Sequence, residues 1–488
     1  MGCGRPSHRL DGRTLTPQTV VAIARHGAPV TLSERGRARN ERAHRAAAEL
    51  ADSGSPIYGR TTGVGSRKDE SVPAGDVDRH AVRLLRSHSG GVGKLLEPDV
   101  ARAILVVRLN QLGAGGAGVG NALLDATESA LNAGLAPQVH ELGSIGTGDL
   151  TALAEAGLSL QGENPWLVDG VAPMPVAFGP GDALAWMSTA ARTLGEAALA
   201  LTDVDVMLRA AETVSVLSLL GVRGTDQALD ERVQAARAHQ GQVAAAAALR
   251  AVLAGTPAPK VRLQDSFAFR CLPQVHGVAR DASAWCYRVL CVELNTAAEN
   301  PLLADGPVAL HNGNFLMTHL TLAFDQLRAA LLQVGMSAVR QLAALLDPEV
   351  TGLPAFLAGV ERASSGVMVL EYTAQSALAE LRAAAHPASL ATALASHGVE
   401  DHASFADLAV RQLSRSREPL ALIIGCVLVA AVRALRMRGG VAGESFARAA
   451  YAVAADLLSS DMSDRPLSDD VTAAARLVAG GRLVLQGG

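Results

Sequence analysis

The chain is poor in aromatic residues, in lysine and in charge of either sign. Aromatic side chains make up 3% of its 488 residues and charged side chains 18%, with a net charge of −4. This balance gives no sign of a basic surface, so we expect neither nucleic acid nor membrane as a partner. Lysine occurs only at Lys68, Lys94 and Lys260, which leaves few candidates for Schiff-base chemistry.

Cysteine is also scarce. The five cysteines, from Cys3 to Cys426, show no C-x-x-C spacing, which is typical of reduced thiols and argues against a zinc site. No secretory signal is visible, because the first residues are polar and interrupted by Gly and Pro. The apolar run from Leu420 to Leu435 is short for a membrane span and predicts a buried core helix. We therefore expect a cytoplasmic protein without a bound metal.

Strand patterns are few and short, whereas helical periodicity covers most of the chain. Apolar residues recur at helical spacing over 41–50, 78–135, 182–255, 276–297, 316–347, 365–385 and 402–438. This pattern predicts a mainly α fold with a few strands in the first third. Long alanine-rich helices with so few aromatics favour a bundle whose helices also pack against other subunits.

A stretch rich in Pro and Gly, 164–181, indicates a boundary. We predict three parts. They are a smaller N-terminal α+β domain over 1–181, a long central helical bundle over 182–440, and a C-terminal helical segment over 441–488.

The stretch from His140 to Leu150 carries the strongest local signal. Its three glycines allow backbone conformations and close approaches that other residues do not. The simplest interpretation is a loop that ends in a helix, with Thr147 or Asp149 as the N-cap.

The run Gly143-Ser144-Ile145-Gly146-Thr147-Gly148-Asp149-Leu150 resembles the signature G-S-[IV]-G-A-S-G-D-L of the histidine and phenylalanine ammonia-lyase family. In that family the Ala-Ser-Gly tripeptide cyclises and loses water to form an electrophile, 4-methylideneimidazol-5-one. The resemblance continues in the same order along the chain, at Tyr58–Gly65, His239–Gln242, Leu263–Val275, Glu299–Leu302, Gly313–Phe315, His386–Ser389 and Glu400–His402. It implies the ammonia-lyase/fumarase-like fold and a homotetramer whose active sites are shared between subunits.

The resemblance also implies roles for individual residues. Tyr58 matches the base that removes the β-proton of the amino acid; its phenol, with a pKa of ~10, would need a lowered pKa to act near neutrality. Arg270 matches the arginine that binds the substrate carboxylate. Further matches to the substrate pocket are Ser87, His88, Asn300, Phe315 and Glu400. For each residue the alternative is an ordinary structural contact.

Three departures from the family pattern fall on the electrophile and its support. The signature is one residue short, so that Thr147 takes the place of the family's serine only if the register slips. Phe267 replaces a tyrosine, and Ser188 replaces an asparagine beside Trp186, where the family has leucine. We therefore expect no methylideneimidazolone-type group and no other cofactor, with Thr147, Ser188 and Phe267 as walls of the substrate pocket.

Three functions remain open. We favour a lyase-like enzyme that works without the prosthetic group and eliminates, adds, isomerises or cyclises a carboxylated substrate, which is amino-acid-like or a natural product of secondary metabolism. The alternative is a true histidine or aromatic amino-acid ammonia-lyase or aminomutase, with an electrophile formed from Gly146-Thr147-Gly148. The third is a tetrameric homologue without catalysis.

Overall fold

The computed structural model describes residues 6–168, 170–171, 173–256, 261–304 and 306–485. Cys3 and Lys260 lie outside these residues. The chain divides into two compact units, each built from segments far apart in the sequence. Unit 1 comprises Met1–Thr202, Tyr287–Leu322 and Pro387–Arg411, and unit 2 comprises Asp203–Cys286, Ala323–His386 and Gln412–Gly488. None of these segments ends at residue 181 or 440, and the domain boundaries there stay predictions.

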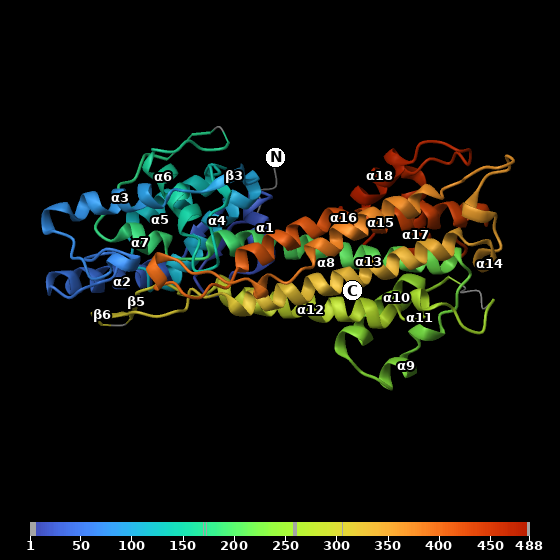
Figure 1. Ribbon diagram of the computed structural model, residues 1–488, viewed down its shortest axis with the longest axis horizontal. Helices are drawn as coiled ribbons and strands as arrows, with labels where there is room; N and C mark the ends of the chain where they lie inside the picture. Colours follow the sequence, from blue (N-terminus) through green and yellow to red (C-terminus); the bar gives the residue numbers. More distant parts are fainter. Residues whose placement is uncertain (1–5, 169, 172, 257–260, 305, 486–488) are drawn as a thin grey trace. The chain divides into compact units, whose positions relative to one another are not determined.

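Helices dominate both units, which confirms the mainly α prediction (Figure 1). Those of unit 1 are α1 (Pro17–Ala24), α2 (Glu34–Asp52), α3 (Val77–His88), α4 (Pro98–Ala114), α5 (Asn121–Asn132), α6 (Leu150–Gln161) and α7 (Asp182–Met187). Those of unit 2 are α9 (Glu231–Ala235), α10 (Gln240–Leu253), α11 (Phe267–Arg270), α14 (Pro348–Thr351), α15 (Val369–Ala384), α17 (Phe446–Leu457) and α18 (Ser468–Ala479). Both units share α8 (Ala191–Gly221), α12 (Leu272–Leu294), α13 (Thr318–Leu346) and α16 (Ala406–Met437).

The described strands are short and pair in twos, all within unit 1. They are β1 (His8–Leu10) parallel to β2 (Val30–Leu32), β3 (Val92–Leu95) antiparallel to β4 (His140–Leu142), and β5 (Leu302–Ala304) antiparallel to β6 (Val308–Leu310). The first four strands lie in the first third of the chain, as predicted. The β5–β6 pair lies beyond the first third of the chain and was not predicted.

Helix α4 forms the core of unit 1. Every residue from Ala101 to Gly113 is buried, and α4 packs against α1, α2 and α5. Over 78–135 two helices were expected, and the structure has three. The glycine-rich stretch 115–120 separates α4 from α5, and Gly115 ends α4 with a φ of +84°.

Close helix packing in unit 2 depends on a glycine, Gly335. A Cβ on Gly335 of α13 would lie 2.7 Å from Leu381 Cδ2 of α15 and 3.4 Å from Ile423 Cδ1 of α16. Glycine therefore lets these three helices approach one another, and they run side by side in Figure 1. Helices α13 and α16 are long and apolar enough to cross a membrane, but 56% and 83% of their most apolar windows are buried inside the protein. The apolar run from Leu420 to Leu435 is thus part of a core helix.

Candidate active site

A cavity of about 470 Å³ in unit 1 collects most of the predicted site residues, and its size is typical of small-molecule sites. Five separate segments contribute to it. The lining residues are Tyr58, Gly65, Lys68, Thr147, Leu150, Leu184, Ser188, Asn300, His311, Gly313, Phe315, Leu316, Val399, Glu400, Asp401 and His402. The structure thus brings together Tyr58, Thr147, Ser188, Asn300, Phe315 and Glu400, as the sequence predicted.

Tyr58 sits on a tight loop before α3. Its hydroxyl oxygen accepts a hydrogen bond of 2.8 Å from the Gly65 amide, which closes the loop. Gly59 has a φ of +67°, and a Cβ there would lie 2.1 Å from Leu184 Cδ2, so only glycine fits. Burial raises the pKa of Tyr58, and the negative charge of Glu400 raises it further. The side chain is therefore a neutral phenol in this state, whereas the sequence argument called for a lowered pKa.

The signature loop is held at its centre by the segment that leads into α16. Ser404 Oγ donates a 2.7 Å hydrogen bond to the Gly146 carbonyl, and the Phe405 amide donates one of 3.0 Å to the Ile145 carbonyl. Ser404 is itself buried, and its own carbonyl accepts a bond from Thr321 Oγ1 at 2.8 Å. The donor to Gly146 is therefore fixed in place.

These contacts explain why glycine stands before Thr147. A Cβ on Gly146 would lie 2.3 Å from Ser404 Oγ and 2.7 Å from the Phe405 nitrogen, so an alanine cannot fit. A Cβ on Gly148 would meet nothing closer than 3.8 Å, although its φ of +102° still favours glycine. The loop is thus tight at the carbonyl of Gly146 and open at Gly148.

Asp149 anchors the C-terminal end of the same loop. Its carboxylate accepts hydrogen bonds from the Thr193 amide at 2.8 Å, from Thr193 Oγ1 at 3.0 Å and from Ser144 Oγ at 2.8 Å. Burial raises the pKa of Asp149, and the positive charge of Arg192 opposes that shift. Asp149 is the N-cap residue of α6, but its side chain accepts hydrogen bonds from the loop and from α8 and none from the α6 amides.

Ser188 lies where the family has an asparagine. Its Oγ accepts a 3.1 Å hydrogen bond from the Asn300 amide, and Asn300 Oδ1 accepts one of 3.0 Å from the Asn312 amide. Trp186, two residues earlier, is fully buried outside the lining set; its Nε1 donates to the Leu153 carbonyl at 2.7 Å. Trp186 therefore belongs to the core and does not make the cavity more apolar.

A buried ion pair supports this wall from behind. Arg108 of α4 and Glu299, the residue before Asn300, lie 3.0 Å apart and are almost completely buried. The Arg108 guanidinium also donates to the Ala185 carbonyl. Burial raises the pKa of Glu299, while the charge of Arg108 holds it down. The pair links α4 to the segments that carry Ser188 and Asn300.

Four ionisable residues of the cavity were not predicted as site residues. They are Lys68, His311, Asp401 and His402. Asp401 and His402 belong to a matched motif from which only Glu400 was selected. Lys68 stands ten positions after Tyr58, and its rarity as one of three lysines was the available signal.

Four predicted residues are not part of this cavity. Ser87 Oγ and His88 Nδ1 lie 3.0 Å and 2.9 Å from the Leu84 carbonyl at the end of α3. Phe267 and Arg270 belong to unit 2, where the Arg270 guanidinium lies 4.7 Å from the Phe267 ring centre. Phe267 is 70% exposed. The substrate-binding roles of these four residues remain predictions.

Comparison with known proteins identifies a family. The family model described as aromatic amino acid lyase matches residues 15–456. A histidine ammonia-lyase of Symbiobacterium thermophilum is 36% identical, with 97% of each chain covered. Another, from Streptomyces coelicolor, is 34% identical over 96% of each chain. Among solved structures, the ergothioneine-degrading ergothionase of Treponema denticola superposes with a TM-score of 0.93 at 28% identity, covering 98% of this chain and 99% of its own.

These relatives contradict two of our predictions. We predicted an enzyme that works without the prosthetic group, and a chain without a cofactor. Both predictions are wrong, because relatives over almost the whole length are named histidine ammonia-lyases. Both predictions rested on a signature loop that is one residue short. The structure instead has a Gly-Thr-Gly segment whose first carbonyl is hydrogen-bonded and whose threonine lines the cavity. The chain belongs to the aromatic amino acid lyase family and is a lyase-like enzyme.

Proposed function

We propose that this protein is an amino-acid ammonia-lyase of the histidine type, with an electrophile formed from Gly146, Thr147 and Gly148. The observation that carries the proposal is the hydrogen bond from buried Ser404 to the Gly146 carbonyl, beside a threonine that lines the cavity. The residues present fit the group, since the loop is open at Gly148. The group, once formed, supplies an electron-poor centre to which the substrate adds.

Formation of the group requires attack of the Gly148 nitrogen on the Gly146 carbonyl carbon. Negative charge then develops on the Gly146 oxygen, where the Ser404 hydroxyl stabilises it. The new carbon–nitrogen bond is retained. The Gly146 oxygen leaves as one water with the hydrogens of the Gly148 and Thr147 nitrogens, and a carbon–nitrogen double bond to the Thr147 nitrogen replaces the carbonyl. The second water takes the Thr147 hydroxyl and the hydrogen on its Cα. No oxidant or other reactant is needed.

Tyr58 is the proposed proton acceptor for the substrate's β-proton. It lines the same cavity as Thr147, and the Gly65 amide fixes its oxygen. Because burial raises its pKa, it acts as a base only in the minor ionised fraction or after the substrate changes its surroundings.

The polar wall formed by Glu400, Asp401, His402 and His311 suits a substrate with a polar ring such as imidazole. Arg270 is proposed to bind the substrate carboxylate from another subunit of a homotetramer. Two observations support this proposal. The Arg270 guanidinium lies over the Phe267 ring in unit 2, outside the unit that holds the cavity, and Phe267 is largely exposed. Ser87 and His88 are proposed to act on the substrate side chain in the same assembly.

Intact mass tests the proposal. We expect the purified wild-type chain to be lighter than its sequence by two water molecules, and Thr147→Ala to have its full sequence mass. Purified protein should also release ammonia from histidine, with phenylalanine, tyrosine and ergothioneine assayed beside it. An unmodified wild-type chain would rule the electrophile out, and a modified chain inactive on all four compounds would rule out this substrate class.

Ser404→Ala tests the role of the hydroxyl. We expect loss of water to slow by about 10²–10³-fold, the typical effect of removing one donor to a developing oxyanion. The freshly purified variant should therefore carry mostly unmodified chains. Ser416→Ala is the matched control, since Ser416 is a buried serine of α16, the helix that follows Ser404, and donates to the Gln412 carbonyl. Complete modification of Ser404→Ala would show that this hydroxyl is dispensable.

A further inference from the structure

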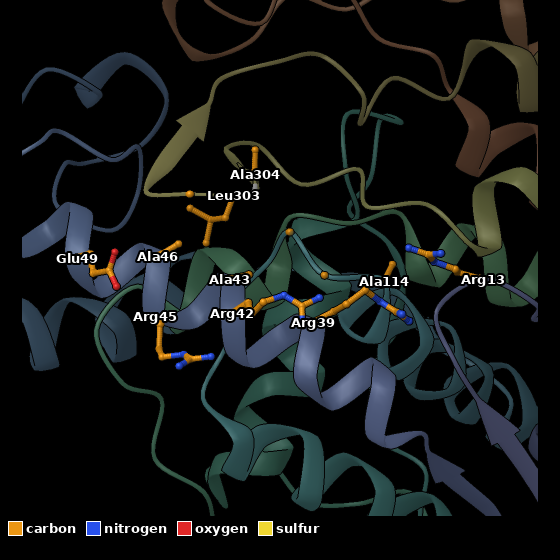
Figure 2. Close-up of a pocket in the computed structure, with 13 residues that line it drawn as sticks. Arg13, Arg39, Arg42, Ala43, Arg45, Ala46, Glu49, Ala114, Leu303 and Ala304 are labelled. Atoms are coloured by element: carbon orange, nitrogen blue, oxygen red, sulfur yellow. The ribbon is translucent and has the colours of Figure 1, made fainter.

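A second cavity of about 470 Å³ in unit 1 is lined by arginines and shares no lining residue with the candidate active site (Figure 2). Figure 2 shows α2 along one side and Leu303 and Ala304 of β5 on the other. The lining residues are Arg13, Arg39, Arg42, Ala43, Arg45, Ala46, Glu49, Ala114, Gly115, Gly116, Leu303, Ala304 and Gly306. We call it the arginine cavity.

Three of its arginines come from one face of α2. Arg39, Arg42 and Arg45 are three residues apart, so successive side chains lie on neighbouring positions of the helix surface. Arg37, on a different face of α2, is neutralised by Asp125 at 2.6 Å and by Glu128 at 2.9 Å. The two faces of this helix therefore differ in how their charge is balanced.

Three arginines of the arginine cavity lack the carboxylate partners that Arg37 has. Within the described chain no carboxylate lies within 4.0 Å of the guanidinium groups of Arg13, Arg42 and Arg45. Arg39 donates to the backbone carbonyls of Gly113, at 2.9 Å, and Asp11. These carbonyls orient Arg39 but carry no full charge to neutralise it.

The nearby carboxylates balance only part of the positive charge of the arginine cavity. Asp11 accepts hydrogen bonds from the Arg13 amide and from both donors of Thr14, each at 2.9 Å and all at Oδ1, so this one oxygen is engaged in a turn. Among the described lining residues, four arginines face one glutamate, Glu49. The pKa of Arg39 is lowered first by burial and then by the charge of Arg13; the charge of Asp11 opposes this shift, and the charges of Arg42 and Arg35 add to it. The arginines thus repel one another where no anion separates them.

The chemistry of the walls narrows the ligand class. Guanidinium groups bind phosphate oxygens through paired donors. The described lining holds no aromatic side chain on which a nucleobase could stack, and its apolar part is alanine and leucine. Three guanidiniums without partners match an anion with two or more linked charges better than a single phosphate does.

We propose that the arginine cavity is a binding site for small molecules with two or more linked phosphate groups. Such a ligand would accept from Arg13, Arg42 and Arg45 and lie against the wall formed by Leu303 and Ala304. The site is independent of the proposed reaction, because no residue of the arginine cavity takes part in it.

Calorimetric titration of the wild-type protein with pyrophosphate, at constant ionic strength, tests the site. We expect saturable binding, on the order of micromolar to low millimolar, as for charge pairs partly exposed to water. The double variant R42Q/R45Q should bind at least about tenfold more weakly, and both changes fall on exposed side chains, so folding is retained. The control R79Q/R83Q removes the same charge from exposed positions of α3 and should bind as wild type does.

Further titrants distinguish linked phosphates from other anions. Tripolyphosphate and ATP should bind at least as tightly as pyrophosphate, whereas orthophosphate and citrate should bind more weakly. Absence of saturable pyrophosphate binding, or equal binding by wild type and R42Q/R45Q, would overturn the proposal. Equal weakening by R79Q/R83Q would also overturn it, since the effect would then come from net charge alone. None of these readouts depends on processing at Thr147.

Discussion

Tyr58→Phe should lower kcat by about 10²–10⁴-fold, the usual contribution of one positioned acid or base. The variant loses only the phenolic oxygen, which lines the cavity and accepts from the Gly65 amide. Its KM should change little, because the ring still fills the same space. The measurement is ammonia release from the amino acid that the wild-type enzyme deaminates, together with intact mass, which should show the same loss of water as wild type.

Tyr451→Phe serves as the control, because it makes the same chemical change on α17, outside the cavity. The pH profile gives a second readout. Burial raises the pKa of Tyr58, so the ionised fraction of the free enzyme grows as pH rises from neutrality. Wild-type kcat/KM should therefore increase over this range more steeply than that of Tyr58→Phe. Wild-type turnover by Tyr58→Phe would remove this tyrosine from the chemistry.

Arg108→Met should destabilise the protein by about 3–5 kcal/mol, because it leaves Glu299 buried without its partner. Denaturant unfolding measures the loss. Arg86→Met is the matched control, since the Arg86–Glu163 pair lies 2.8 Å apart but the Arg86 side chain is 59% exposed. That change should cost much less, because water screens the charges of an exposed pair. Replacing both members, as R108M/E299L, should recover part of the loss.

The stability of Arg108→Met should depend on pH. Burial already raises the pKa of Glu299, and loss of the Arg108 charge raises it further. A carboxyl whose folded pKa exceeds its unfolded value takes up a proton on folding, so stability grows as pH falls towards the unfolded value. The deficit of Arg108→Met relative to wild type should therefore be smaller at about pH 5 than at about pH 8. A deficit that is the same at both values would mean that Glu299 is not left as an unpaired charge.

Local pattern was enough to predict the long helices, and the family resemblance was enough to predict six of the residues that line the cavity. The long helices α12, α13, α15 and α16 follow from apolar periodicity, which is a property of neighbouring residues. Tyr58, Thr147 and Glu400 followed from motif matches. In contrast, whether Trp186 faces the cavity or the core depends on its contact with Leu153 of α6. The place of Trp186 in a sequence motif does not reveal that contact.

The status of the signature loop was the largest error, and its cause is physical. Comparing letters treats the loop as a string with one residue missing. Whether Gly146 can be attacked depends on what contacts its carbonyl, and that contact comes from Ser404. Likewise, nothing in the local sequence of α2 indicates that Arg42 and Arg45 lack carboxylate partners while Arg37 has two.

The hydrogen bond between Ser404 and Gly146 joins residues 258 positions apart. While the protein is being synthesised, the loop leaves the ribosome long before the segment that holds its carbonyl exists. A cyclisation that relies on this contact cannot begin on the nascent N-terminal part. A chain that has lost two waters would therefore have been synthesised through Ser404 and have folded so that Ser404 contacts Gly146. A truncated or misfolded chain would keep its unprocessed threonine.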